Sequence, residues 1–142
     1  MTIEKQLVNR ELSQRIKELG VKQESLFWWV KEYGYSIMDG ANTIDTEEWG
    51  VVYADNLNDT ISKQKGEHIS ALTVAELGEM LPNFIGDGTQ LFFWNTGNKS
   101  YCQYWDKEKK YIPNGNAVEA DTEADARAKM LIYLIENNLI TL

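Results

Sequence analysis

Residues with the chemistry for catalysis or metal binding are few in this sequence of 142 residues. It holds one histidine, His68, and one cysteine, Cys102, which stand far apart in the chain. Nucleophilic catalysis needs an activated group with a base within hydrogen-bonding reach, and a zinc site needs His and Cys ligands at short, regular spacings. The sequence shows neither pattern. We therefore expect no catalytic residue, no metal ligand and no cofactor; an enzyme that uses two converging Asp or Glu side chains is the least supported alternative.

One glycine-rich stretch, residues 86–89, has the composition of a phosphate-binding loop. Its sequence is Gly-Asp-Gly-Thr, and it lacks the lysine and the following helix that a P-loop requires. A strand pattern follows instead, so we expect a turn here.

Aromatic residues are concentrated in the segments with strand character, and the chain has five tryptophans. The candidate contacts for a partner or a ligand are Trp28, Trp94, Tyr104 and Trp105. These rings could stack on bases or on a ring-shaped ligand, but stacking platforms usually have Arg or Lys nearby. The basic residues close in sequence are Lys99 and those within 107–110. Two other roles are open: filling the core, because aromatic residues favour strands, and forming a homo-oligomer interface.

The net charge of -8 comes from one segment of the chain. Residues 32–62 contain seven acids and no Lys or Arg, whereas the rest of the chain has fifteen acids against fourteen bases. Within this segment, Asp45, Glu47 and Glu48 are candidate contacts for a basic protein surface. The alternative is a solvated, partly mobile insertion over residues 38–67. Because nucleic-acid binding requires a basic face, we expect no direct binding to nucleic acid.

The periodicity of apolar residues predicts three helices and several strands. The helices are expected within residues 6–19, 72–81 and 121–142, and the strands within 25–32, 49–53, 90–95, 100–106 and 111–112. Strands grouped between terminal helices, with a hairpin and no βαβ alternation, indicate an α+β fold with a mainly antiparallel sheet. We expect the N-terminal and C-terminal amphipathic helices to cover one face of that sheet, together with the short central helix.

Several residues mark where these helices begin and end. Gly20 is expected to end the first helix, and Thr73 with Glu76 forms a capping box at the start of the second. Thr122 is expected to cap the last helix, with Asp125 at the reciprocal position, and Asn137 or Asn138 is expected to supply the left-handed residue that ends it. The apolar face of the last helix is predicted to comprise Ala124, Ala128, Leu131, Ile132 and Ile135.

The composition is that of a soluble protein, with 43% hydrophobic and 25% charged residues. The length predicts one domain over residues 1–142. No apolar run is long enough to cross a membrane, so we expect no membrane partner. A single cysteine excludes an internal disulfide and is consistent with a reducing cytoplasm.

Three stretches carry a resemblance to a known group of proteins. They are residues 7–20, residues 72–82, which begin Leu-Thr-Val-Ala-Glu-Leu, and residues 123–132, which begin Glu-Ala-Asp-Ala. The chain resembles a family of small proteins of unknown function encoded in bacteriophages and prophages. The resemblance implies a bacterial host cell and a cytoplasmic location. It brings no site residues, because the family has no known activity.

These observations favour a non-enzymatic phage-type accessory protein that acts by binding another protein, as an inhibitor of a host factor or as an adaptor. The alternative is a protein that binds or sequesters a small ligand, in a pocket between the hairpin and the last helix. Such a pocket would be a closed concavity lined by Trp94, Tyr104 or Trp105 with a few convergent polar groups.

Overall fold

The computed structural model describes residues 3–30, 49–53, 68–86, 88–108 and 110–142. The helices in these residues are the 3-10 helix η1 (Ile3–Gln6) and the α-helices α1 (Arg10–Glu18), α3 (Val74–Met80) and α4 (Glu123–Glu136). The strands are β1 (Phe27–Val30), β2 (Gly50–Tyr53), β3 (His68–Ser70), β4 (Phe84–Ile85), β5 (Thr89–Thr96), β6 (Lys99–Trp105), β7 (Tyr111–Ile112) and β8 (Val118–Ala120). Every strand pairing is antiparallel within this part of the chain. The α+β fold predicted from the sequence is confirmed.

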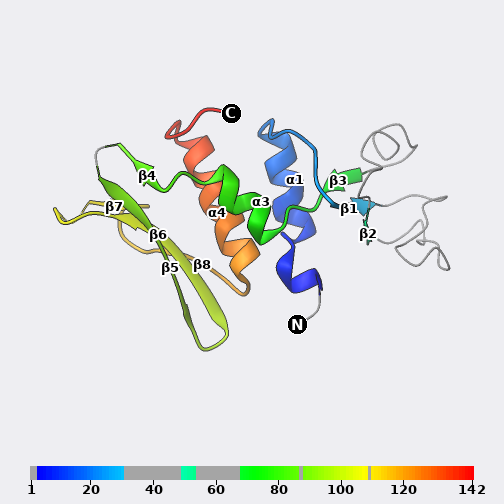
Figure 1. Ribbon diagram of the computed structural model, residues 1–142, viewed down its shortest axis with the longest axis horizontal. Coiled ribbons are helices and arrows are strands. Elements are labelled where there is room, and N and C mark those ends of the chain that lie inside the picture. Colours follow the sequence, from blue (N-terminus) through cyan, green and yellow to red (C-terminus); the bar gives the residue numbers. More distant parts are fainter. Residues whose placement is uncertain (1–2, 31–48, 54–67, 87, 109) are drawn as a thin grey trace.

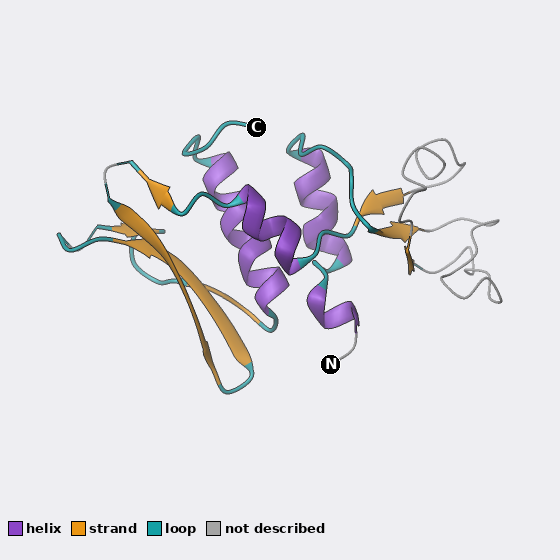
Figure 2. Ribbon diagram, viewed as in Figure 1, coloured by secondary structure: helices purple, strands orange, loops and turns teal. Residues whose placement is uncertain are grey.

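The strands form two separate sheets, and the helices lie between them (Figures 1 and 2). One sheet has the order β2-β1-β3, and the other has the order β4-β5-β6-β7 with β8 also paired to β6. Helix α4 packs against β6 and β8, whereas α1 packs against α4 and β3. The sequence predicted that the N-terminal and C-terminal helices cover the same sheet face. This prediction was wrong, because α4 lies between α1 and the larger sheet.

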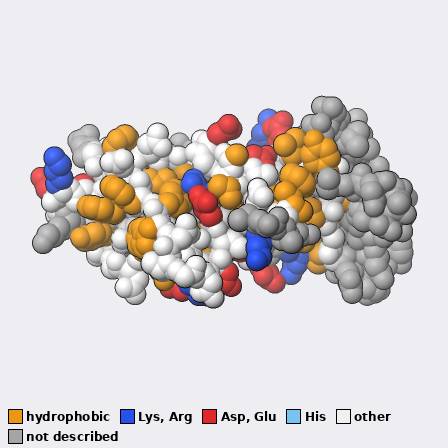
Figure 3. All heavy atoms as spheres, turned by 60° about the horizontal axis from the view of Figure 1, so that its bottom comes forward, with side chains coloured by type: hydrophobic (Ala, Val, Ile, Leu, Met, Phe, Trp, Pro, Cys, Tyr) orange, Lys and Arg blue, Asp and Glu red, His pale blue; other side chains and the backbone are white. Residues whose placement is uncertain are grey.

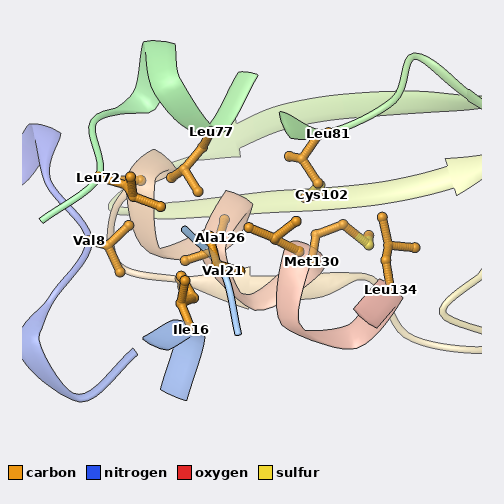
Figure 4. Close-up of a cluster of buried hydrophobic side chains, with 14 of the residues drawn as sticks. Val8, Ile16, Val21, Leu72, Leu77, Leu81, Cys102, Ala126, Met130 and Leu134 are labelled. Atoms are coloured by element: carbon orange, nitrogen blue, oxygen red, sulfur yellow. The ribbon is translucent and has the colours of Figure 1, made fainter. Parts of the chain in front are cut away.

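The main core surrounds α4 (Figure 4). The buried residues of this helix are Ala124, Ala126, Ala128, Met130, Leu131 and Leu134. They face both the sheet and the neighbouring helices, so the single apolar face predicted from the sequence was too narrow. Ile132 and Ile135, which were assigned to that face, are only partly buried.

Helix α1 begins at Arg10, four residues after the predicted start at residue 6. The apolar residues before it are extended: Leu7 forms an antiparallel bridge with Thr73, and the backbone N–H of Val8 donates to the Leu72 carbonyl at 3.0 Å. This pairing with a distant segment withdraws both residues from the helix, although their spacing continues its apolar pattern.

Residues in the left-handed conformation end α1 and α4. Gly20 has φ +90°, and the N–H of the following Val21 donates to the Ile16 carbonyl at 3.3 Å. Asn138 has φ +56°, and the N–H of Leu139 donates to the Leu134 carbonyl at 2.8 Å. Both helix ends lie where the sequence predicts them.

The predicted start of the central helix is confirmed. The Thr73 hydroxyl accepts from the Glu76 N–H at 3.1 Å, and the Glu76 carboxylate accepts from the Thr73 N–H at 2.9 Å. The same carboxylate oxygen accepts from the Ser25 hydroxyl at 2.8 Å. The capping box therefore also anchors the segment that leads into β1.

The predicted hairpin is confirmed as β5 and β6, which pair from Gln90↔Trp105 to Thr96↔Lys99. Gly97, with φ +58°, is the first residue of the two-residue loop, which is typical of a type II′ turn. Strands β3, β4 and β8 were not predicted. Each has only two or three residues, too few for an alternating pattern to be recognised.

The first turns of α1 and α4 are joined by one carboxylate. Asp125 Oδ1 accepts from the backbone N–H of Asn9 at 2.8 Å, and Asp125 Oδ2 accepts from Asn9 Nδ2 at 3.1 Å. Asn9 itself caps α1, since its Oδ1 accepts from the Leu12 N–H at 2.8 Å. Thr122 caps α4 as predicted. Asp125, expected to reach back to Thr122, instead binds the cap of the other helix.

We expect Asp125→Ala to lower the free energy of unfolding by about 2 kcal/mol, because hydrogen bonds to a charged group contribute more than neutral ones. Thr122→Ala, which removes only the cap of α4, should cost about 1 kcal/mol. Urea unfolding of the two variants measures the difference. A loss in Asp125→Ala no larger than that in Thr122→Ala would show that the link between the helices contributes little.

Candidate functional site

The larger sheet has one face on α4 and one face directed away from the helices. Leu91, Phe93, Cys102 and Tyr104 pack in the core around α4. Because side chains alternate along a strand and paired residues share a face, the strand registers assign the opposite parity to the outer face. The aromatic residues of that outer face are Phe84, Phe92, Trp94, Tyr101, Trp105 and Tyr111. We call these six residues the aromatic face.

Much of the aromatic face is accessible to a partner. Phe84 is 55% exposed, Trp94 and Trp105 are each 38% exposed, and Tyr111 is 39% exposed. Hydrophobic side chains are grouped at the end of the molecule formed by this sheet (Figure 3). These exposed apolar side chains lie on four neighbouring strands of one sheet face, and grouped apolar surface of this kind marks interaction sites.

The rings of the aromatic face are ordered by contacts with one another. Phe92 stacks on Trp105 with ring centroids 4.3 Å apart, and Trp94 stacks on Tyr101 at 5.5 Å with only 8° between the ring planes. Both contacts cross from β5 to β6, where cross-strand aromatic pairs stabilise a hairpin. The two stacks therefore present fixed ring surfaces.

A buried amide lies on the same strand face, between the two stacks. Gln103 is only 8% exposed and pairs with Phe92 in the register. Its Nε2 donates to the carbonyl oxygens of Pro113 at 3.2 Å and Gly115 at 3.1 Å. These bonds hold the loop between β7 and β8 against the sheet, so the amide is engaged within the protein.

Among the described residues, the strands contribute one cationic side chain to this face, that of Lys99, and it is paired with acidic side chains. Its ammonium donates to the Asp121 carboxylate and lies 4.0 Å from the nearest Glu119 oxygen. The hydrogen bond to Asp121 and the charge of that carboxylate raise the pKa of Lys99, and the same hydrogen bond lowers the pKa of Asp121. Lys99 therefore stays charged but is neutralised by its own neighbours.

The structure separates the four aromatic residues chosen from the sequence. Trp94 and Trp105 belong to the aromatic face. Tyr104 is fully buried on the opposite face, where its hydroxyl donates to the Pro82 carbonyl at 2.6 Å. Trp28 is 1% exposed in the smaller sheet, and its Nε1 donates to the Ser25 carbonyl at 3.1 Å. Trp28 and Tyr104 are therefore core residues and present no contact surface.

Four members of the aromatic face were not among the candidates. Phe92 and Tyr101 could have been found, because they alternate with Phe93 and Cys102 within the predicted hairpin. Phe84 lies in a two-residue strand that was not predicted, whereas Tyr111 lies in the strand predicted over 111–112 but was not chosen as a candidate contact.

The acidic candidates Asp45, Glu47 and Glu48 lie outside the described residues, as does most of the predicted insertion over 38–67. Within that insertion the structure describes residues 49–53, which contain β2 paired with β1 as expected for a strand.

A hollow of about 530 Å³ lies between the hairpin and the start of α4, where the ligand-binding alternative placed its pocket. It is lined by Lys5, Gln6, Val74, Asn95, Ser100, Asp121, Thr122 and Glu123. None of the tryptophans or tyrosines proposed for the pocket is among them. Several of its polar groups have partners: Glu123 accepts from Arg127 at 2.8 Å, and the Ser100 hydroxyl donates to Asn95 at 2.7 Å. The hollow therefore lacks the aromatic lining that the ligand-binding alternative requires.

The residues considered for catalysis are not brought together. His68 lies in β3 of the smaller sheet, with its ring 5.8 Å from that of Trp28, whereas Cys102 lies in β6 of the larger sheet. Burial raises the pKa of the Cys102 thiol to about 12, so this thiol is protonated at neutral pH and unreactive. The described residues contain no group of three or more His, Cys, Asp or Glu side chains that could hold a metal ion.

We expect the Cys102 thiol of the native protein to resist alkylation by iodoacetamide at pH 8, because burial keeps it neutral and out of reach. The same thiol should react completely once urea unfolds the chain. Mass spectrometry measures the reaction at a single position, since the chain has one cysteine. Labelling of native and unfolded protein at equal rates would contradict the burial of this side chain.

Comparison with known proteins adds no relative: no family model, curated protein or solved structure matches this chain. None of the helices in the described residues is long and apolar enough to cross a membrane.

Proposed function

We propose that this chain is a non-enzymatic binding protein that acts on another protein through the aromatic face. The observation that carries the proposal is the set of six aromatic side chains on one outward sheet face, four of them 38–55% exposed. The residues considered for catalysis support no competing enzymatic function, since the single Cys and His lie in different sheets.

The size of the aromatic face supports a protein as the partner. Aromatic side chains bury about 150–250 Å² each, so the exposed fractions of Phe84, Trp94, Trp105 and Tyr111 correspond to roughly 350 Å². A standard interface covers about 800 Å² on each partner, with an apolar, aromatic-rich centre and a polar rim. The aromatic face has the size and composition of such a centre.

The charge of the face distinguishes a protein partner from a nucleic acid. Single-stranded nucleic acids bind to aromatic platforms that also carry cations for the phosphates. Here Lys99 is neutralised by Asp121 and Glu119. An apolar protein surface needs no such cation, and charge depletion at the centre is typical of protein interfaces.

We further propose that the protein belongs to the phage-type accessory class and acts in the bacterial cytoplasm, as an inhibitor of a host factor or as an adaptor. This part of the proposal is supported by the sequence resemblance. The acidic residues Asp45, Glu47 and Glu48 supply a second candidate contact, which favours a partner with basic residues around its apolar surface.

The test is capture of proteins from bacterial cytosol by the intact chain and by the double variant Trp105→Ser/Tyr111→Ser. We expect a stoichiometric protein on the wild-type chain and its loss from the double variant, because both substitutions remove exposed rings from the centre of the proposed interface. Urea unfolding checks that the variant is folded.

The matched control is Leu26→Ser, which removes an exposed apolar side chain near β1, outside the aromatic face. It should retain the captured protein. Capture that is equal for the wild type and the double variant, or absent from the wild type, would refute the proposal.

A further inference from the structure

Strand β5 has an open edge. On one side it pairs with β6 along its length; on the other, β4 pairs only with Thr89 and Gln90, and the Leu91 N–H donates to the Asn83 carbonyl at 3.0 Å. The next five residues of β5, from Phe92 to Thr96, have no strand partner on that side among the described residues. We call these five residues the open edge.

The direction of the Leu91 bond shows which backbone groups are free. In an antiparallel ladder, alternate residues direct their N–H and C=O groups to opposite sides of the strand. Since Leu91 bonds outward to Asn83, Phe93 and Asn95 also direct their backbone groups outward. Two donors and two acceptors therefore lie on the open edge without a ladder partner.

The open edge lacks the protection that natural edge strands have. Such strands usually carry a charged residue such as Lys, contain a Pro, or are covered by a loop, because unpaired backbone groups recruit other strands. The open edge reads Phe-Phe-Trp-Asn-Thr and has no charge and no proline. An unprotected edge beside an exposed aromatic surface is a site for strand addition.

We propose that two copies of this chain pair through the open edge, with β5 antiparallel to its own copy about a two-fold axis at Trp94. The two residues whose backbone groups point away from β6, Phe93 and Asn95, are symmetric about Trp94, which is the central residue of the open edge. Phe93 of each copy would then face Asn95 of the other, and the two residues would exchange the free backbone hydrogen bonds in both halves. This surface is the strand edge, so the inference goes beyond the proposed function of the aromatic face.

Side chains and charges are compatible with this pairing. At the axis, Trp94 would meet its own copy in a non-hydrogen-bonded pair, where cross-strand side chains are closest and aromatic pairs are favourable. Residues 81–122, which include the larger sheet, hold five acids and four bases, so the net charge of -8 resides mostly elsewhere. Pairing would join the larger sheets of the two copies into one continuous sheet and place their aromatic faces side by side.

Sedimentation velocity over a range of concentrations tests the proposal. We expect the wild type to form a dimer, and Asn95→Pro to remain a monomer at concentrations where the wild type is dimeric. Proline removes the outward N–H of residue 95 but leaves the bonds to β6 intact, because that N–H does not take part in the β5–β6 ladder. The matched control is Asn95→Ala, which loses the same side-chain bond to Ser100 but keeps the N–H, and it should dimerise like the wild type.

A second measurement locates the axis without relying on the proline variant. In a Cys102→Ala background, Trp94→Cys should form a disulfide-linked dimer under mild oxidation, because the two residues 94 would face each other. Asn98→Cys in the same background, at the exposed hairpin turn, should not. A wild type that is monomeric at all concentrations, a dimer that persists in Asn95→Pro, or equal crosslinking at the two positions would overturn the proposal.

The two proposals fail separately. A monomeric wild type that captures a protein through Trp105 and Tyr111 refutes the dimer and keeps the proposed function. If the captured protein is also lost from Asn95→Pro, the open edge belongs to that partner instead of to a second copy. A wild type that dimerises but captures no protein supports the proposed dimer and refutes the proposed function.

Discussion

The position of α4 constrains the rest of the structure. This helix is covered by the larger sheet on one side and by other helices on another, so the sizes of its buried residues must match the space on each side. Ala124, Ala126 and Ala128 let neighbouring elements approach the first turns, while Met130 and Leu134 fill the space further along. The carboxylate of Asp125 then fixes where α1 meets α4, because it satisfies two donors of Asn9 at once. A helix enclosed in this way has little freedom to shift.

The same constraint determines which aromatic rings are exposed. Because α4 occupies one face of the hairpin, residues of that parity, including Tyr104, become core. Residues of the opposite parity, including Trp94 and Trp105, lie on the outer face of the sheet. A core built around a helix thus creates the aromatic face without any local feature that marks it as a surface. The burial of Cys102 and the exposure of Trp94 and Trp105 have this one cause.

Local signals in the sequence were sufficient for much of the fold. The capping box of Thr73 and Glu76, the left-handed residues Gly20 and Asn138, and the hairpin turn depend on residues close together in the chain. These features were predicted correctly. The interactions that were missed join distant residues, such as the Asn9–Asp125 bonds across 116 positions.

The candidate site was predicted only in part for the same reason. The alternation of aromatic residues in the hairpin can be read from the sequence, but which parity faces outward depends on where α4 lies. Trp28 and Tyr104 were therefore chosen beside Trp94 and Trp105, although they are core residues. The strand edge was hidden as well, since the extent of β4 cannot be read from its two residues.

The stacked rings of the aromatic face have a consequence for the thermodynamics of association. A flexible side chain that becomes fixed in an interface loses conformational entropy worth about 0.5–1.5 kcal/mol. The rings of Phe92 and Trp105, and those of Trp94 and Tyr101, already restrict one another in the unbound chain. Much of that entropy has therefore been lost during folding, and complex formation retains a larger share of the favourable contact energy.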